Sequence, residues 1–233
     1  MPEEFLATLL HMMKSQATPE GEEWFERTLT ALQSPLSESK LLAAYTAAQR
    51  HLGKGLADTG RVALLLHVAR TAADAFPKLA LACYESGDSS EQASWLRGLS
   101  VLPGCERFLA TAIDACRTNI LPQFEALACE NPYPSRYFPE LNFNQMVLKA
   151  AFNGVSLSRI VGIESRFNSE LSRMANDFVS EREAAGRDVP VDIWLVIAPK
   201  VETSELARVQ RYLKHENPQH RHWAGIGLSH RKD

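Results

Sequence analysis

Several polar and charged side chains on two predicted helices have the types that acid–base or anion-binding chemistry requires. The helices span residues 139–153 and 168–185, and the side chains are Glu140, Asn144, Lys149, Arg173, Asp177, Glu181 and Arg182. Asp177 or Glu181 could act as a general base. Lys149 or Arg173 could then hold an anionic substrate beside it. The same residue types also form ion-pair networks that only join helices, so a polar pocket and a structural network are the two alternatives.

Arg182, Glu140 and Asn144 fall on helix faces that are otherwise apolar. At about 100° per residue, Arg182 lies among the apolar residues of the later helix, and Glu140 and Asn144 lie among those of the earlier one. A charge or an amide on such a face costs free energy unless it is paired or hydrogen-bonded. We therefore expect Arg182 to be largely buried and bonded to a carboxylate, first of all that of Glu140. Asp177 and Glu181 are the next candidates.

Standard catalytic and metal-binding signatures are absent from the sequence. It contains no glycine-rich phosphate loop, no GxSxG, no HExxH and no cysteine–histidine spacing typical of a metal site. Four of the seven histidines crowd the last nineteen residues, at positions His215, His220, His222 and His230. Their spacing matches no usual ligand pattern. We therefore predict no catalytic residue, metal or cofactor, and a solvated terminal helix around these histidines.

Helix signals dominate the chain, and strand-like alternation does not persist for more than a few residues. A capping residue precedes a proline at the first helical position in Thr18-Pro19, Ser34-Pro35, Asn131-Pro132 and Asn217-Pro218. Asp88 and Glu91 have the spacing of a capping box. The apolar segment 189–200 has a proline where a helix could begin and has no partner strand, so we predict a short buried helix there. The sequence therefore predicts an all-α fold.

The turns that start helices recur at related distances. Asp88 and Asn131 are 43 residues apart, and Asn131 and Asn217 are 86 residues apart. Such a period is typical of helix-pair solenoids of the HEAT type, and it predicts turns at residues 34–37, 86–89, 131–134 and 216–219. The further turn expected near Met174 falls inside a predicted helix instead. We therefore predict a degenerate HEAT-like array in a single domain over residues 1–233, with an irregular helical bundle as the alternative.

Composition and charge exclude some classes of protein. The 233-residue chain is 45% hydrophobic and 23% charged with a formal net charge of −3, which is ordinary for a globular domain and unfavourable for nucleic-acid binding. The longest apolar run, 193–199, is too short for a membrane span of about 20 residues. The N-terminus lacks the basic region of a secretory signal, and the cysteines at 83, 105, 116 and 129 lack CxxC spacing. Reduced thiols in a cytoplasmic protein are therefore expected.

Three stretches are long and unusual in composition: LRGLSVLPGCERFLATAIDACRTN, NPYPSRYFPELNFNQMVLKAAFNG and LSRIVGIESRFNSELSRMANDFVSEREAAGRDVPVDIW. They lie within residues 85–195 and resemble the EboA family, small proteins of bacterial gene clusters tied to natural-product metabolite traffic. The resemblance implies a role in moving or handling a secondary-metabolite precursor, beside enzymes and a prenyltransferase-like membrane protein. It implies no catalytic residue.

We expect from these features a non-catalytic adaptor or small-molecule carrier in the trafficking or export of a secondary-metabolite precursor. The alternative is an enzyme that acts on a small anionic or prenylated metabolite through the polar pocket between helices. The expected partners are other proteins of the same pathway, in the cytoplasm or at the inner membrane surface, and not nucleic acid. Because exposed aromatic and arginine side chains often dominate interfaces, Arg136, Tyr137 and Arg159 are the candidate contacts.

Overall fold

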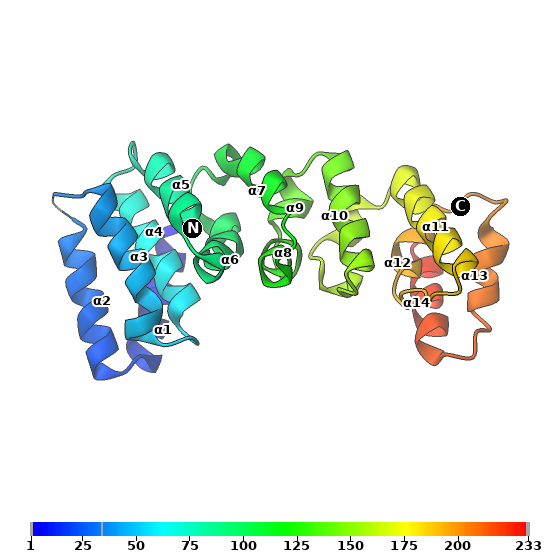
Figure 1. Cartoon of the computed structure of the whole chain (residues 1–233), viewed down its shortest axis with the longest axis horizontal. Coiled ribbons are helices and arrows are strands. Elements are labelled where there is room, and N and C mark those ends of the chain that lie inside the picture. The colour runs from blue at the N-terminus through cyan, green and yellow to red at the C-terminus, as the bar shows by residue number, and fades with distance from the viewer. Residues whose placement is uncertain (1, 34, 232–233) are drawn as a thin grey trace. The chain divides into compact units, whose positions relative to one another are not determined.

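The structure is helical throughout the residues that it describes. The computed structural model describes residues 2–33 and 35–231, which form helices joined by turns, without a strand among them (Figure 1). The all-α class predicted from the sequence is therefore confirmed. The ambiguous segment 189–200 contains the short helix α12 (Trp194–Ile197), as predicted, and every residue of α12 is buried.

The chain divides into two compact units, Met1–Leu127 and Ala128–Asp233. The first unit contains α1 (Pro2–Gln16), α2 (Pro19–Ala31), α3 (Glu38–Leu52), α4 (Ala57–Thr71), α5 (Phe76–Ser86), α6 (Ser89–Gly98), η1 (Leu99–Val101), η2 (Cys105–Phe108), α7 (Leu109–Ala115) and α8 (Leu121–Ala128), which ends at the boundary. The second contains α9 (Tyr133–Tyr137), α10 (Glu140–Phe152), η3 (Leu157–Arg159), η4 (Ile163–Arg166), α11 (Ser169–Ala184), α12, α13 (Leu206–Tyr212) and α14 (Pro218–Ser229). The HEAT-like array and the single domain stay predictions.

Side-chain caps fix where several helices begin. Both hydrogen bonds of the predicted capping box are present at α6: Asp88 Oδ1 accepts from the Glu91 N–H at 2.9 Å, and Glu91 Oε2 accepts from the Asp88 N–H at 3.2 Å. Thr18 caps α2 and Asn217 caps α14, as predicted. Each cap satisfies an N–H group that the first helical turn leaves without an intrahelical partner.

The predicted helix starts near residues 34 and 131 differ in detail from the structure. Ser34 lies outside the described residues, and α3 begins later than predicted, at Glu38, with Ser37 as its cap. Asn131 Oδ1 accepts from the Tyr133 N–H at 3.0 Å, but Pro132 takes the N-cap position and α9 begins at Tyr133. The helix start is therefore displaced by one residue at α9 and by more at α3.

The core of the first unit is built around α4. This helix is buried continuously from Gly60 to Val68 and packs against α1, α3 and α6. A helix that is covered on nearly every side suits a central position. The close approach of α6 depends on Gly98, because a Cβ atom there would lie 2.4 Å from Val62 Cγ2.

One charged side chain, Arg61, lies inside this core and was not predicted. Its Nε donates to the Tyr45 carbonyl at 3.0 Å, and Nη1 donates to Ser94 Oγ at 2.9 Å. Its Nη2 lies 3.7 Å from Glu91 Oε1, and the two side chains are only 2% and 6% exposed. Arg61 therefore joins α4 to α3 and α6, and it does so through the same carboxylate that completes the capping box.

The core of the second unit is built around α12, which packs against α11 and α14. Trp194 is fully buried there. Gly227 permits the close approach of α14, because a Cβ atom would lie 2.3 Å from the Trp194 carbonyl oxygen and 2.8 Å from Ala198 Cβ. On α11, Ser172 donates to the Ile197 carbonyl at 2.7 Å. These contacts hold α11 and α14 against the same short helix.

Replacement of Arg61 by methionine should leave the buried Glu91 carboxylate without its charged partner. We expect the free energy of unfolding to fall by about 3–5 kcal/mol, because removal of one partner leaves the other charge buried without compensation. Urea unfolding followed by far-ultraviolet circular dichroism measures the change.

The double variant Arg61→Met, Glu91→Gln removes both charges and should recover part of the lost stability. Arg70→Met, in the exposed last turn of the same helix, is the matched control and should cost less than about 1 kcal/mol. If Arg61→Met were as stable as the unchanged protein, the buried ion pair would not be a structural requirement.

Candidate functional site

The buried amide of Asn144 on α10 finds its partner in the cap of α11. Asn144 Nδ2 donates to Asn168 Oδ1 at 3.2 Å, and Asn168 Nδ2 donates back to Asn144 Oδ1 at 3.0 Å. Asn168 Oδ1 also accepts from the Leu171 N–H at 2.7 Å and so caps α11. The pair explains why an amide lies on the apolar face of α10, and it ties the start of α11 to that helix.

The structure corrects the expectation that Arg182 pairs with a carboxylate. Arg182 is half-buried, its Nε donates to the main-chain carbonyl of Asp188, and its guanidinium carbon lies 5.6 Å from the centroid of the Phe178 ring. Glu140, the expected partner, is exposed in the first turn of α10, where the helix dipole stabilises a carboxylate without burial. The residues after α11 therefore supply the hydrogen bond that a neighbouring helix was expected to supply.

Most of the other predicted pocket residues form an exposed polar surface. Arg173 makes ion pairs with Glu170 and Asp177, both at 2.7 Å, and all three side chains are exposed. Glu181 is exposed as well, and Lys149 is half-buried on α10. Ion pairs on such a surface contribute little to stability.

Of the three predicted partner contacts, Arg136 is the most exposed. Arg159 makes a two-point ion pair with Glu130, with N–O distances of 2.9 and 3.0 Å, and its carbonyl accepts from the Glu130 N–H at 2.9 Å. The Tyr137 ring packs on the Tyr133 ring, with centroids 4.8 Å apart. Arg159 and Tyr137 thus contact residues of their own unit, and a role of any of the three in partner binding stays a prediction.

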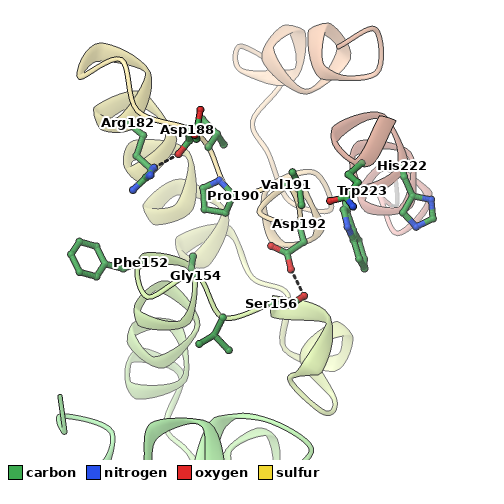
Figure 2. A pocket seen from close by; sticks show the side chains of 14 residues that line it. Phe152, Gly154, Ser156, Arg182, Asp188, Pro190, Val191, Asp192, His222 and Trp223 are labelled. Carbon is green, nitrogen blue, oxygen red and sulfur yellow. Dashed lines mark hydrogen bonds between the residues drawn. The ribbon is translucent and has the colours of Figure 1, made fainter. Parts of the chain in front are cut away.

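A pocket of about 560 Å³ lies in the second unit, where the C-terminal ends of α10 and α11 meet the first turns of α14 (Figure 2). Segments 151–156, 188–192 and 219–223 contribute its lining, together with Arg182. Small-molecule sites in proteins typically measure about 300–1,000 Å³. Of the side chains predicted to form a polar pocket, Arg182 is the one that lines this cavity.

A second cavity, of about 430 Å³, lies at the start of α11. Its lining includes Arg173 and Lys200 together with Glu170, Glu202 and Glu205. Arg173 is already paired with Glu170, so little basic character is left for a ligand. We therefore take the larger cavity as the candidate site.

Asp192 fixes the segment that forms one wall of the candidate site. Its Oδ2 accepts from Ser156 Oγ at 2.6 Å and from the Leu157 N–H at 2.7 Å, and Figure 2 shows the first of these bonds. The buried carboxylate thereby caps η3 from a distant part of the chain. Asp192 was not predicted. The available signal was a lone carboxylate inside the apolar run 189–200, which needs a partner once that run is buried.

A buried histidine, His220, links α14, which forms one wall of the candidate site, to α12. His220, only 6% exposed, accepts at Nδ1 from the Trp194 indole N–H at 2.9 Å, and its ring packs against those of Tyr212 and His215. Because the indole donates, Nδ1 carries no proton in this arrangement. Burial, and then the charge of His215, lower the pKa of His220. Burial and the hydrogen bond to Glu183 raise the pKa of Tyr212 to about 12.

The other C-terminal histidines lie in different surroundings, and the terminal helix is partly buried rather than solvated as predicted. His222 lines the pocket, whereas Nε2 of His230 lies 3.8 Å from Oε1 of Glu164. Across residues 2–33 and 35–231, no three His, Cys, Asp or Glu side chains lie close enough together to hold a metal ion. No helix in these ranges is long and apolar enough to cross a bilayer.

Comparison with known families agrees with the resemblance seen in the sequence. The sequence model of a family described as metabolite traffic protein EboA matches residues 55–198, more than half of the 233-residue chain. The chain belongs to the EboA family. No curated protein and no solved structure gives a match. The EboA match contains Arg182 and two of the lining segments, whereas the α14 wall at 219–223 lies beyond it.

The stability of this EboA-family protein should fall in mild acid because of His220. The ordinary pKa of histidine is 6.5 and the folded state lowers it, so the unfolded chain binds the proton more readily. The contribution of His220 to stability is complete above about pH 6.5 and is lost as the pH falls through the lower folded pKa, by at most about 1.4 kcal/mol per pH unit. Urea titrations between about pH 7.5 and about pH 5 measure this slope.

His220→Asn keeps an acceptor for the Trp194 indole and cannot be protonated, so it should reduce the slope. Burial is also the main cause that lowers the pKa values of His51 and His67. These two histidines account for any pH dependence of stability that remains in His220→Asn. His222→Asn, on the exposed side of the same helix, controls for the substitution itself. A slope identical in His220→Asn and the unchanged protein would contradict this role of His220.

Proposed function

We propose that this EboA-family protein is a non-catalytic carrier, which binds one small metabolite in the pocket of its second unit and delivers it to other proteins of the same pathway. The observation that supports the proposal most directly is the pocket itself, about 560 Å³ in volume and walled by three helices and a turn. The description of the family as metabolite traffic proteins agrees with the movement of a small molecule.

The pocket walls combine apolar surface with a few polar groups, as small-molecule sites usually do. Pro190 and Val191 provide apolar surface in the segment between α11 and α12 (Figure 2). Trp223 is half-buried, and the centroid of its ring lies 5.2 Å from that of His222. An indole in such a position offers a flat apolar surface to a ligand.

The acidic side chains give no specific support to general-base catalysis in this pocket. Asp177 and Glu181, the bases considered from the sequence, are exposed on α11 and do not line it. Of the two acidic residues that line it, Asp192 accepts at Oδ2 from the Ser156 hydroxyl and the Leu157 N–H and is bound into the fold, and Asp188 is exposed to solvent. Reversible binding needs no such base, so the carrier explains the observed groups with fewer requirements than the enzyme.

A carrier must also meet a partner, and we propose the exposed apolar face of α10 as the surface for a protein of the same pathway. Leu141 is 59% exposed and Phe152 is 71% exposed. They are 11 residues apart, about three helical turns, so they share one side of the helix. Figure 2 shows Phe152 directed away from the other lining side chains, at the edge of the pocket. Exposed apolar side chains that share one helix face can contribute to an interaction site.

The neutral fluorescent probe N-phenyl-naphthylamine should bind to the pocket with one molecule per chain. Its fluorescence should rise on binding, because the probe leaves water for an apolar site. Gln219→Trp should weaken binding at least about tenfold, since Gln219 is exposed and lines the pocket, where a larger side chain takes up volume. A fluorescence titration measures both effects.

Gln219→Ala is the matched control, and it should bind the probe about as well as the unchanged protein does. Mass spectrometry of the probe recovered after incubation should show an unaltered mass, as carriage without chemistry requires. No saturable binding, or equal binding by Gln219→Trp and Gln219→Ala, would overturn the assignment of this pocket.

A further inference from the structure

We infer that the metabolite carried in the pocket is an amphipathic monoanion, namely an apolar, ring-containing molecule with a single carboxylate that binds Arg182. This ligand class rests on the proposed function, because it concerns the same pocket. Three features support it: the way Arg182 is held, the position of the acidic side chains, and the character of the α14 wall.

Arg182 is held in place without being neutralised. Its Nε donates to the Asp188 carbonyl, which Figure 2 shows, and its guanidinium approaches the Phe178 ring. Both contacts orient the guanidinium, but neither supplies a negative charge. The two Nη groups, which present the fork that matches a carboxylate, make no hydrogen bond to any described residue.

Two other half-buried arginines of the second unit, Arg166 and Arg208, use both Nη groups within the fold. Arg208 Nη1 donates to Asn176 Oδ1 at 2.7 Å, and its Nη2 lies 3.7 Å from Glu183 Oε2. Arg166 donates from Nη1 and Nη2 to two main-chain carbonyls, at 2.7 and 2.8 Å. Both Nη groups of each arginine are thus in use within the fold. Arg182 departs from this pattern at the place where it lines a cavity.

The two carboxylates of the pocket limit the charge of the ligand. Asp192 is buried and satisfied by Ser156 and Leu157, and Asp188 is exposed and contributes its carbonyl to Arg182. No ion pair joins either carboxylate to Arg182 within the described residues. Arg182 can pair with one negative charge on a ligand, and the two carboxylates nearby disfavour a second one.

The α14 wall is suited to the apolar part of such a ligand. Trp223 is half-buried beside His222, and Pro190 and Val191 extend the apolar surface toward Arg182. In Figure 2 the rings of Trp223 and His222 lie on the opposite side of Pro190 from Arg182. A ligand that satisfies both ends has a charged head at Arg182 and a flat apolar body at Trp223.

Competition among matched naphthalene derivatives tests this ligand class. The compounds are naphthalene carboxylate, naphthalene methanol, naphthyl phosphate and naphthylmethylamine, and each is titrated at pH 8 against bound N-phenyl-naphthylamine. We expect the carboxylate to displace the probe at about a tenfold lower concentration than the alcohol, because a charge-assisted hydrogen bond adds to the shared apolar contact. The doubly charged phosphate should compete less well than the carboxylate.

Arg182→Met should abolish the preference for the carboxylate over the alcohol while the neutral probe still binds. Arg187→Met, in the adjacent turn, changes the net charge equally, does not line the pocket, and should keep the preference. Arg182→Lys keeps the positive charge but lacks the paired Nη donors of the guanidinium, so it should retain part of the preference for the carboxylate over the alcohol. This variant tests the proposal if the methionine variant fails to fold.

The outcomes separate the ligand class from the carrier proposal. If the neutral probe does not bind at all, the pocket is not a carrier site and the proposed function fails. If the probe binds but the carboxylate and the alcohol displace it equally, the pocket stands and the monoanion is wrong. Tighter binding of the amine or of the phosphate than of the carboxylate would also overturn the ligand class.

Discussion

Helix N-termini leave backbone N–H groups without intrahelical acceptors, and the second unit depends on how two of these termini are satisfied. Asn168 caps α11 and at the same time exchanges hydrogen bonds with Asn144 of α10. Asp192 accepts from the Leu157 N–H at the start of η3. In each case one polar side chain completes a helix start and joins it to a distant segment. The pocket walls are therefore positioned by the hydrogen bonds that satisfy helix ends.

Charge is used differently in the two units. In the first unit Arg61 and Glu91 are both buried and lie beside each other, so the cost of removing two charges from water is offset by their pairing. In the second unit Arg182 is oriented by a carbonyl and an aromatic ring, neither of which neutralises it. The last turn of α11 suits a cation, because the helix dipole stabilises positive charge there, but the Nη groups of Arg182 are not used within the described part of the fold.

The sequence predicted local features well and long-range pairings poorly, and the physical reason differs from residue to residue. The caps at Asp88 and Asn217 involve atoms a few residues apart, so the residue types and their spacing were enough to identify them. A helical periodicity shows which face Arg182 occupies but not what lies opposite, and the acceptor came from the turn after the helix. Arg61 was missed because its partners lie on two other helices. Asp192 likewise bonds to a segment that only the fold brings near.

Gly227 has a consequence for the energetics of ligand binding. Because a Cβ atom there would lie 2.3 Å from the Trp194 carbonyl oxygen, α14 rests directly on the backbone of α12. In the carrier that we propose, the wall formed by α14 is thus shaped before the ligand binds. A preformed wall loses little conformational entropy on binding, so differences in affinity between ligands report on their contacts rather than on an ordering cost. Apolar ligands that enter such a pocket characteristically bind with favourable enthalpy and a negative change in heat capacity.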